Sequence, residues 1–311
     1  MSDTVNQTAT VTFQNNVEAQ LQQTQSLILG ADAIETQDAK GEAVTVKDLI
    51  GNTMPQEADE RHGDLKQTQV SHERAWLTKP NELYFNEYVD GADQLATEID
   101  LAGGYTMAAM ATINRAWDDQ ALVGMYSPII TGKERTTTTS FPGSQVVPVA
   151  TGGAAGPQRM NVAKLIAANE LLDGNFVDKT ERRFMIISAK QNSDLLAEVP
   201  ATSSDFKAAY GGEFTDGRIT RLLGWNFIHM ELRNPFLRAF SKFGLTVDQN
   251  GYTRNPFWVR SGVRMGIWQK LRTAIKDQPS KVDTRSVFAG TTVAATRTQA
   301  PKVGIILNSE A

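Results

Sequence analysis

The order of elements in residues 161–230 constrains the fold of this chain more than any other feature. Apolar residues recur on one helical face across 162–172, so a helix is predicted there. Asn161 stands at its start as a capping residue, and Gly174 stands at its end as a stop. The continuous apolar run 184–187 then predicts a short buried strand.

A second helix is predicted directly after this strand. Ser188 opens it, and Gln191, three residues on, completes a capping-box pattern. A short helical turn is then expected at 219–223, ended by Gly224, and it leads into a strand at 225–230. This alternation of helices and strands indicates a mixed α+β domain.

An alternating pattern that is interrupted by charge occupies the region between residues 41 and 90. Alternating apolar residues occur at 44–46, 75–77 and 83–85, whereas 57–74 is highly charged. The pattern predicts a long two-stranded excursion with a solvated tip. Because an isolated hairpin is only marginally stable in water, we expect this excursion to lie on a second copy of the chain.

The longest predicted helix runs from about residue 105 to 125. Trp117 belongs to its apolar face, while Arg115, Asp118 and Asp119 line the other side. Adjacent residues on a helix diverge by about 100°, so the two carboxylates do not share one site. We interpret them as surface groups that pair with Arg115.

Weaker patterns complete the chain. Residues 1–12 are polar and are expected to lack regular structure, and the glycines at 103–104 are expected to interrupt the helical pattern before the long helix. Short helices are predicted at 14–29 and 93–100, and C-terminal strands at 256–263, 267–275, 284–295 and 303–307.

Composition argues against several kinds of catalytic or metal site. The 311 residues include no cysteine, which excludes disulfides, thiolate zinc sites and cysteine nucleophiles. His62, His72 and His229 lack metal-ligand spacing. Ser204 and Lys207 match a short serine-acylase pattern, but its companion motifs are missing. We therefore predict no catalytic residue, cofactor or metal, and keep a serine hydrolase as an alternative.

Charge is divided unevenly along the chain. Residues 1–217 hold 16 Lys and Arg against 30 Asp and Glu, whereas residues 218–311 hold 15 against 5. The two parts could present solvated faces that simply differ, or acidic and basic surfaces of neighbouring copies could meet. A basic C-terminal third that faces nucleic acid is a third interpretation. No signal or membrane-spanning segment is visible, so no membrane partner is expected.

Five segments, taken in sequence order, resemble the major capsid proteins of tailed bacteriophages, the family with the Hong Kong 97-like fold. Together they span roughly residues 40–300. They are 61–64 with 71–74, 114–119, 131–133 with 141–142, 161–230, and 276–281 with 294–297.

The resemblance implies an α+β subunit with the Hong Kong 97-like capsid fold. Its expected parts are an N-terminal arm at 1–40, an extended β-hairpin loop at 41–90, a peripheral domain with a long spine helix at 91–129, an axial α/β domain at 130–235, and C-terminal strands at 236–311 that complete the peripheral and axial domains. Loop residues expected to contact a neighbouring subunit are Asp59, Glu60, Arg61, Asp64, Lys66, Glu73 and Arg74. Residues expected to pack the base of the loop and the spine are Trp76, Tyr84, Phe85 and Trp117.

The function that the resemblance implies is structural. The chain would self-assemble into the icosahedral head shell that encloses phage DNA. The implied partners are further copies in hexamers and pentamers, a separate scaffold protein, a portal protein, a decoration protein, and packaged double-stranded DNA held by non-specific contact. The implied location is the virion capsid, after assembly in the host cytoplasm. An encapsulin-like protein nanocompartment is the alternative within the same structural class.

Overall fold

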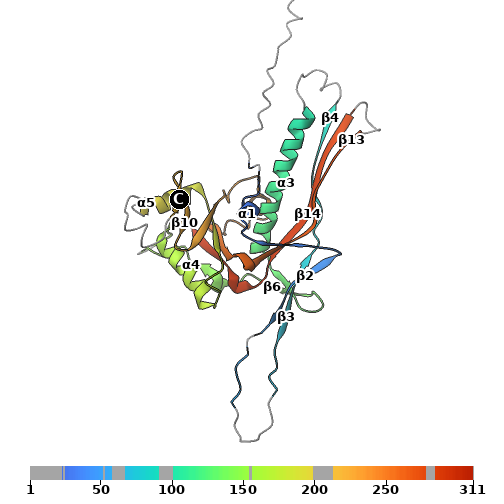
Figure 1. The fold of residues 1–311 in the computed structure, drawn as a ribbon. Coiled ribbons are helices and arrows are strands. Elements are labelled where there is room, and N and C mark those ends of the chain that lie inside the picture. Colours follow the sequence, from blue (N-terminus) through green and yellow to red (C-terminus); the bar gives the residue numbers. More distant parts are fainter. Residues whose placement is uncertain are drawn as a thin grey trace, which may run out of the picture. The chain divides into compact units, whose positions relative to one another are not determined.

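The computed structural model describes residues 23, 25–51, 53–57, 67–90, 101–153, 156–198, 213–277 and 284–310 (Figure 1). The chain divides into two compact units. Unit 1 contains Met1–Gln25, Glu82–Ala116 and Gln269–Thr291, and unit 2 contains Ser26–Asn81, Trp117–Trp268 and Thr292–Ala311. Three elements contribute residues to both units: α3 (Leu101–Tyr126), β13 (Val263–Asp277) and β14 (Thr284–Arg297).

A mixed seven-stranded sheet forms the centre of unit 2. β8 pairs with one neighbour in parallel, β11, and with another antiparallel, β12. The strands lie in the order β7 (Val146–Val147), β15 (Val303–Asn308), β12 (Thr253–Val259), β8 (Arg183–Ile187), β11 (Trp225–His229), β10 (Arg218–Leu222) and β9 (Glu213–Thr215).

Each face of this sheet is covered by helices. Met185 and Ile187 pack on the side of α4 (Val162–Gly174) and α5 (Ala189–Glu198). Phe184 and Ile186 pack on the other side, in a cluster that includes residues of α1 (Leu27–Gly30) and the C-terminal part of α3. The α7 turn (Arg238–Ser241) also contributes to this second cluster. Successive strand residues therefore alternate between two cores, as expected of a sheet that is buried on both faces.

The capping residues predicted for α4 and α5 are confirmed. The side chain of Asn161 accepts a hydrogen bond from the backbone N–H of Lys164 at 2.9 Å. The Ser188 N–H donates to Gln191 Oε1 at 3.0 Å, and the Gln191 N–H donates to Ser188 Oγ at 3.3 Å. This reciprocal pair is a capping box, which satisfies donors that a helix start leaves without partners.

The predicted helical turn at 219–223 is wrong, because these residues form strand β10 and the turn that follows it. Leu222 pairs with Trp225 across a two-residue turn. The turn residues Leu223 and Gly224 have φ values of 53° and 82°. Positive φ at both central residues defines the tight hairpin turn whose twist suits antiparallel strands. A leucine pair followed by glycine is equally typical of a helix end, so the local pattern was ambiguous.

The long predicted helix is confirmed as α3, but the glycines before it do not interrupt it. Gly103 and Gly104 lie inside the helix, and neither has a positive φ. Glycine lowers helix stability by about 1 kcal/mol relative to alanine without ending the helix. The helices predicted at 14–29 and 93–100 fall mostly or wholly outside the described residues.

A two-stranded antiparallel ribbon extends from the rest of unit 2 (Figure 1). It consists of β2 (Ala43–Ile50) and β3 (His72–Thr78), which we call the ribbon. At the base of the ribbon, β3 pairs with β5 (Ile129–Thr131), and β5 pairs with β6 (Thr137–Thr139). The sheet order is therefore β2-β3-β5-β6.

The strands β13 and β14 carry two further pairings, one in each unit. In unit 2, β1 (Glu35–Asp38) pairs in parallel with residues of β13. In unit 1, β4 (Leu83–Asp90) pairs antiparallel with β14 over eight residues. The C-terminal strands predicted at 267–275, 284–295 and 303–307 are confirmed with longer bounds. The strand predicted at 256–263 is shifted to Thr253–Val259 and is followed by the short helical turn η3 (Arg260–Gly262). Within the described residues, no helix is both long and apolar enough to cross a membrane.

Candidate assembly surfaces

The outer part of the ribbon buries almost no apolar surface within its own chain. Near the base, Val46, Ala75 and Leu77 are buried in a small cluster with residues of β5 and β14. Farther out, Ile50 is 72% exposed and Met54 is 87% exposed. Large apolar side chains at such exposure suit a surface that another protein covers.

An exposed ion pair joins the two strands of the ribbon. The Arg74 guanidinium donates to both carboxylate oxygens of Asp48, at 2.6 and 3.1 Å. This hydrogen bonding lowers the pKa of Asp48. Glu73, the neighbour of Arg74, is exposed. The other predicted loop residues, Asp59, Glu60, Arg61, Asp64 and Lys66, lie outside the described residues.

Trp76 lies at the base of the ribbon. Its indole N–H donates to the carbonyl oxygen of Gly132 at 2.6 Å. The guanidinium groups of Arg74 and Arg135 lie 5.5 and 5.7 Å from the ring centroid, within the range of cation–π attraction. These contacts fasten β3 to the turn that connects β5 and β6.

Tyr84 and Phe85 lie in β4 and belong to unit 1. Tyr84 is 67% exposed, and its ring stacks on Phe288 of β14 with the centroids 6.0 Å apart. The guanidinium of Arg272 lies 4.9 Å from the centroid of the same Phe288 ring. Phe85 is half-buried on the opposite face of the strand. Trp117 packs against the core of unit 2 that contains α1.

Asp118 and Asp119 are not surface groups, which corrects the sequence-based interpretation. Their exposures are 1% and 2%. Asp118 accepts hydrogen bonds from Ser26 Oγ and the Leu27 N–H, at 2.6 and 2.8 Å, and so caps α1. Asp119 accepts from the Ala239 N–H at 2.6 Å, and burial raises its pKa. The two carboxylates hold different segments against one helix.

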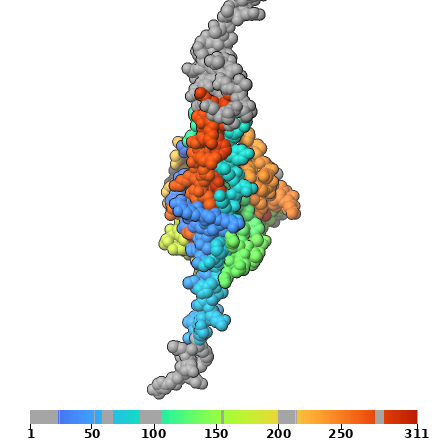
Figure 2. All heavy atoms as spheres, turned by 90° about the vertical axis from the view of Figure 1, so that its right-hand side faces the viewer, coloured from blue at the N-terminus to red at the C-terminus, as the bar shows by residue number. Residues whose placement is uncertain are grey.

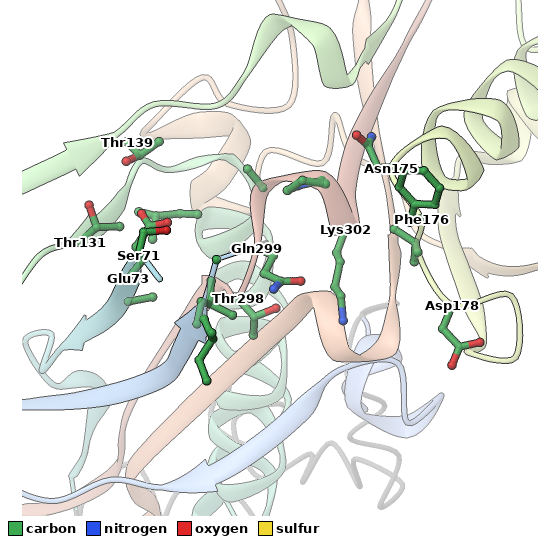
Figure 3. Close-up of a pocket in the computed structure, with 18 of the residues that line it drawn as sticks. Ser71, Glu73, Thr131, Thr139, Asn175, Phe176, Asp178, Thr298, Gln299 and Lys302 are labelled. Atoms are coloured by element: carbon green, nitrogen blue, oxygen red, sulfur yellow. The ribbon is translucent and has the colours of Figure 1, made fainter. Parts of the chain in front are cut away.

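A cavity of about 620 Å³ lies in unit 2 beside the ribbon (Figure 3). Ser71 and Glu73 line it from the ribbon side, and Phe176 and Asp178 line it from the turn after α4. Lys302, in the turn η4 (Ala300–Lys302), lies between these groups (Figure 3). Its ammonium donates to Ser261 Oγ at 2.7 Å and pairs with Glu181 at 3.6 Å. The lining carries no nucleophile paired with a base, so it does not form a catalytic constellation.

Two of the three histidines lie in the described part of the chain. His229 Nε2 lies 2.9 Å from the carbonyl oxygen of Ile219, and His72 lies on the ribbon. No group of three His, Asp or Glu residues in the part of the chain that the structure describes could hold a metal ion. His62, Ser204 and Lys207 lie outside the described residues.

The projecting ribbon exposes apolar side chains such as Ile50 and Met54, which is typical of a protein that contacts other proteins through its surface. Comparison with known proteins identifies the family of this chain. The model of the phage capsid protein family matches residues 5–310, so the chain belongs to the phage capsid proteins. A search of curated proteins found no match.

Solved capsid structures share the fold at low sequence identity. The capsid of cyanophage P-SCSP1u is 11% identical, with a TM-score of 0.70 over 99% of this chain and 95% of that one. The capsid of cyanophage Pam1 is 9% identical, with a TM-score of 0.69 over 96% of each chain. The capsid of Ralstonia phage GP4 is 12% identical, with a TM-score of 0.66 over 97% of this chain and 95% of that one.

The expected α+β capsid fold is therefore confirmed. The chain is a structural major capsid protein of the phage head shell, and it is not an enzyme. The family match favours the phage capsid over the nanocompartment and hydrolase alternatives.

Proposed function

We propose that the ribbon of each copy lies on a neighbouring copy and that this contact drives closure of the shell. The observation that carries the proposal is the exposure of Ile50, at the end of β2, and of Met54, which follows it, outside the small core at the base of the ribbon. A two-stranded ribbon is marginal in water, and burial of each such side chain contributes about 1.5–3 kcal/mol. A neighbouring copy supplies the surface that the ribbon's own chain does not.

The proposal also covers the roles of the two units and the further partners of the shell. Unit 1 would act as the peripheral domain, and the seven-stranded sheet with α4 and α5 would act as the axial domain. The copies would form hexamers and pentamers in the host cytoplasm, on a separate scaffold protein and around a portal protein. A decoration protein would bind the finished shell, and DNA would touch it without sequence preference.

Polar substitution of the ribbon's exposed side chains tests the proposal. We expect the variant with Ile50→Ser and Met54→Ser to sediment as single copies or small oligomers under conditions in which the unaltered chain forms shells. The control carries Thr45→Ser and Lys47→Ser, nearer the ribbon base, and should assemble normally. Urea unfolding should give the same midpoint for both variants. Shells of normal yield from the Ile50 and Met54 variant would contradict the proposal.

A further inference from the structure

Phe176, in the turn after α4, has a backbone conformation that is unusual for its residue type. Its φ is 56°, in the left-handed region that glycine enters without cost and bulky residues rarely enter. The Phe176 N–H donates to the carbonyl oxygen of Asp173, and the Val177 N–H donates to that of Leu172, both at 3.1 Å. This pair of hydrogen bonds closes a helix end at which the left-handed residue is usually glycine. Strain of this kind is concentrated at functional sites.

The Phe176 ring is also exposed. Its side chain is 95% exposed, more than any other large apolar side chain in the described part of the chain. The ring lies at the side of the 620 Å³ cavity, near Asn175 and Asp178 (Figure 3). Glycine at this position would remove both the strain and the exposed ring. The isolated chain therefore gains nothing from phenylalanine here, whereas a partner that covers the ring would.

The opening of the cavity is acidic. Glu73 and Asp178 line it and are exposed. Hydrogen bonds from the N–H and the hydroxyl of Thr180 lower the pKa of Asp178, so its carboxylate is charged at neutral pH. The other charged lining groups, Glu181 and Lys302, pair with each other at 3.6 Å. A cavity of this size with partly apolar walls and a negative opening suits aromatic and basic side chains.

A second surface of unit 2 has the complementary character. Residues 232–247, which we call the α7 loop, contain three basic residues and no acidic residue. Phe236 and Phe243 are 78% and 45% exposed. The Arg238 guanidinium and the Lys242 ammonium each lie 5.7 Å from the centroid of the Phe243 ring, within the range of cation–π attraction. Figure 2 shows the orange segment that contains this loop as a protrusion.

The α7 loop is held in place by its own chain. The buried Ala239 donates its N–H to Asp119 at 2.6 Å, and Arg233 pairs with Glu310 at 3.0 Å. Lys242, by contrast, is exposed. Because the loop is already fixed, it loses little conformational freedom when another surface covers it.

We propose that the cavity beside Phe176 in one copy receives the α7 loop of a neighbouring copy. The exposed phenylalanines of the loop would pack on the Phe176 ring, and its cations would face the acidic opening. The cavity and the loop are different surfaces of the same chain, so the contact is head-to-tail and repeats around a ring. This inference rests on the proposed assembly of identical copies and names a contact beyond that of the ribbon.

Phe176→Gly separates the stability of the chain from its assembly. Because glycine accepts a positive φ without strain, we expect the midpoint of thermal unfolding of the unassembled chain to rise by about 2–4 °C. The yield of shells should nevertheless fall at least about tenfold, since the ring that anchors the contact is lost. The control is Ile166→Ser, which replaces a 50% exposed side chain of α4 outside the cavity lining and should assemble normally.

Two results with Phe176→Gly would overturn the proposal. A normal yield of shells would show that the ring anchors no contact between copies. A lower unfolding midpoint would show that Phe176 serves the fold of its own chain.

Exchange of charges tests which two surfaces meet. Lys242→Glu should reduce the yield of shells at least about tenfold, because it brings like charges together at the opening of the cavity. Glu73→Lys, added to the same chain, should restore most of the yield. Glu170→Lys is the control, because Glu170 is an exposed carboxylate of α4 outside the cavity lining, and it should restore nothing. No restoration by Glu73→Lys, or equal restoration by both, would overturn the proposal.

The absence of cysteine from the sequence allows the contact to be located directly. Gln299→Cys places a thiol in the cavity lining, and Ser241→Cys places one on the exposed side of α7. Chains with one cysteine each are co-assembled and treated with a short bis-maleimide reagent, and denaturing gels report linked pairs. We expect linked pairs of these two chains, and none when Ile166→Cys replaces Gln299→Cys.

The cross-linking result also separates this proposal from the proposed function. Intact shells without linked pairs would overturn the inference, while the proposed assembly would stand. A chain with both cysteines, diluted with an excess of the unaltered chain, should give no internal link, and an internal link would overturn the inference as well. Failure of the unaltered chain to form shells would instead count against the proposed function.

Discussion

At the scale of single residues, the informative groups are polar side chains that the fold buries. Asp118 and Asp119 follow one another on α3, yet each holds a different segment, one capping α1 and the other receiving the Ala239 N–H. The helical period placed both on the polar side, and that side meets α1 and α7 in the folded chain. Sequence could identify the residues but not the segments that cover them.

Lys164 is the clearest case of a buried charge. Its side chain is fully buried. The ammonium donates to the carbonyl oxygens of Gln158 and Leu307, both at 2.8 Å, and to Asn308 Oδ1 at 2.9 Å. The lysine thus ties α4 to the C-terminal strand. Burial lowers its pKa from 10.5 to about 8.

Replacement of Lys164 by methionine should destabilise the chain and change how stability depends on pH. At pH 7 we expect a loss of about 1–3 kcal/mol, because buried acceptors lose their donor. Between pH 8 and 10.5 the unfolded chain binds more protons at Lys164 than the folded chain. Stability due to the lysine therefore rises with pH across that window, and the gap between the unaltered chain and Lys164→Met should widen.

Urea unfolding of both proteins at several pH values checks this prediction. Lys179→Met is the control, because the Lys179 side chain is 77% exposed, and it should leave the curve unchanged. A gap for Lys164→Met that stays constant from pH 7 to 10.5 would show that the lysine titrates normally in the fold.

At the scale of elements, the close packing of α3 on β14 within unit 2 depends on one glycine. A Cβ added at Gly124 would lie 2.4 Å from the backbone carbon and oxygen of Ala295. At Gly174, the last residue of α4, an added Cβ would meet nothing within 4 Å. Substitution at Gly124 therefore tests close packing, whereas substitution at Gly174 tests helix propensity.

Alanine substitution at these two positions should have opposite effects. Gly124→Ala should lower stability by about 1–3 kcal/mol, because overpacking forces the backbone apart. Gly174→Ala should be neutral or raise stability by up to about 1 kcal/mol through helix propensity. Thermal unfolding followed by circular dichroism compares the two variants. Equal stability of both would mean that α3 and β14 are not in close contact at Gly124.

Some helices and strands could be predicted from the local sequence, and others could not. The starts of α4 and α5 were predictable because Asn161, Ser188 and Gln191 act on backbone groups a few residues away. The hairpin at Leu223 was not predictable, because leucine followed by glycine is as typical of a helix end as of a hairpin turn. The partner of β4 was equally hidden, since strand pairing over about 200 residues leaves no local signal.

At the scale of the whole molecule, part of the uneven charge is neutralised within unit 2. Asp32 accepts from Arg182 and Arg260 at 2.6 and 2.7 Å, and Glu35 pairs with Arg264. Arg260 and Arg264 of the basic C-terminal third thus pair with acidic residues near the start of the described chain. Composition suggested contacts between copies or solvated faces, and it could not reveal pairing between distant parts of one copy.

The residues predicted for the contact site also fall into two groups, those that a local sequence pattern could locate and those that it could not. Arg74 and Trp76 were found on the ribbon and at its base, where alternation and charge could locate them. Tyr84 and Phe85 were assigned to the same excursion by sequence proximity, but the chain leaves the ribbon after Thr78 and enters another sheet. The cavity beside Phe176 had no sequence signal, because its lining comes from segments that are far apart in the chain.

Electron cryomicroscopy of particles purified from cells that express the chain is the measurement we would make first at this scale. We predict closed shells of uniform diameter in which each ribbon lies against a neighbouring copy, with Ile50 and Met54 buried in that contact. Shells whose ribbons end in solvent, at a distance from every other copy, would contradict the proposed role of the ribbon. A chain that stays a single copy at high concentration would contradict self-assembly itself.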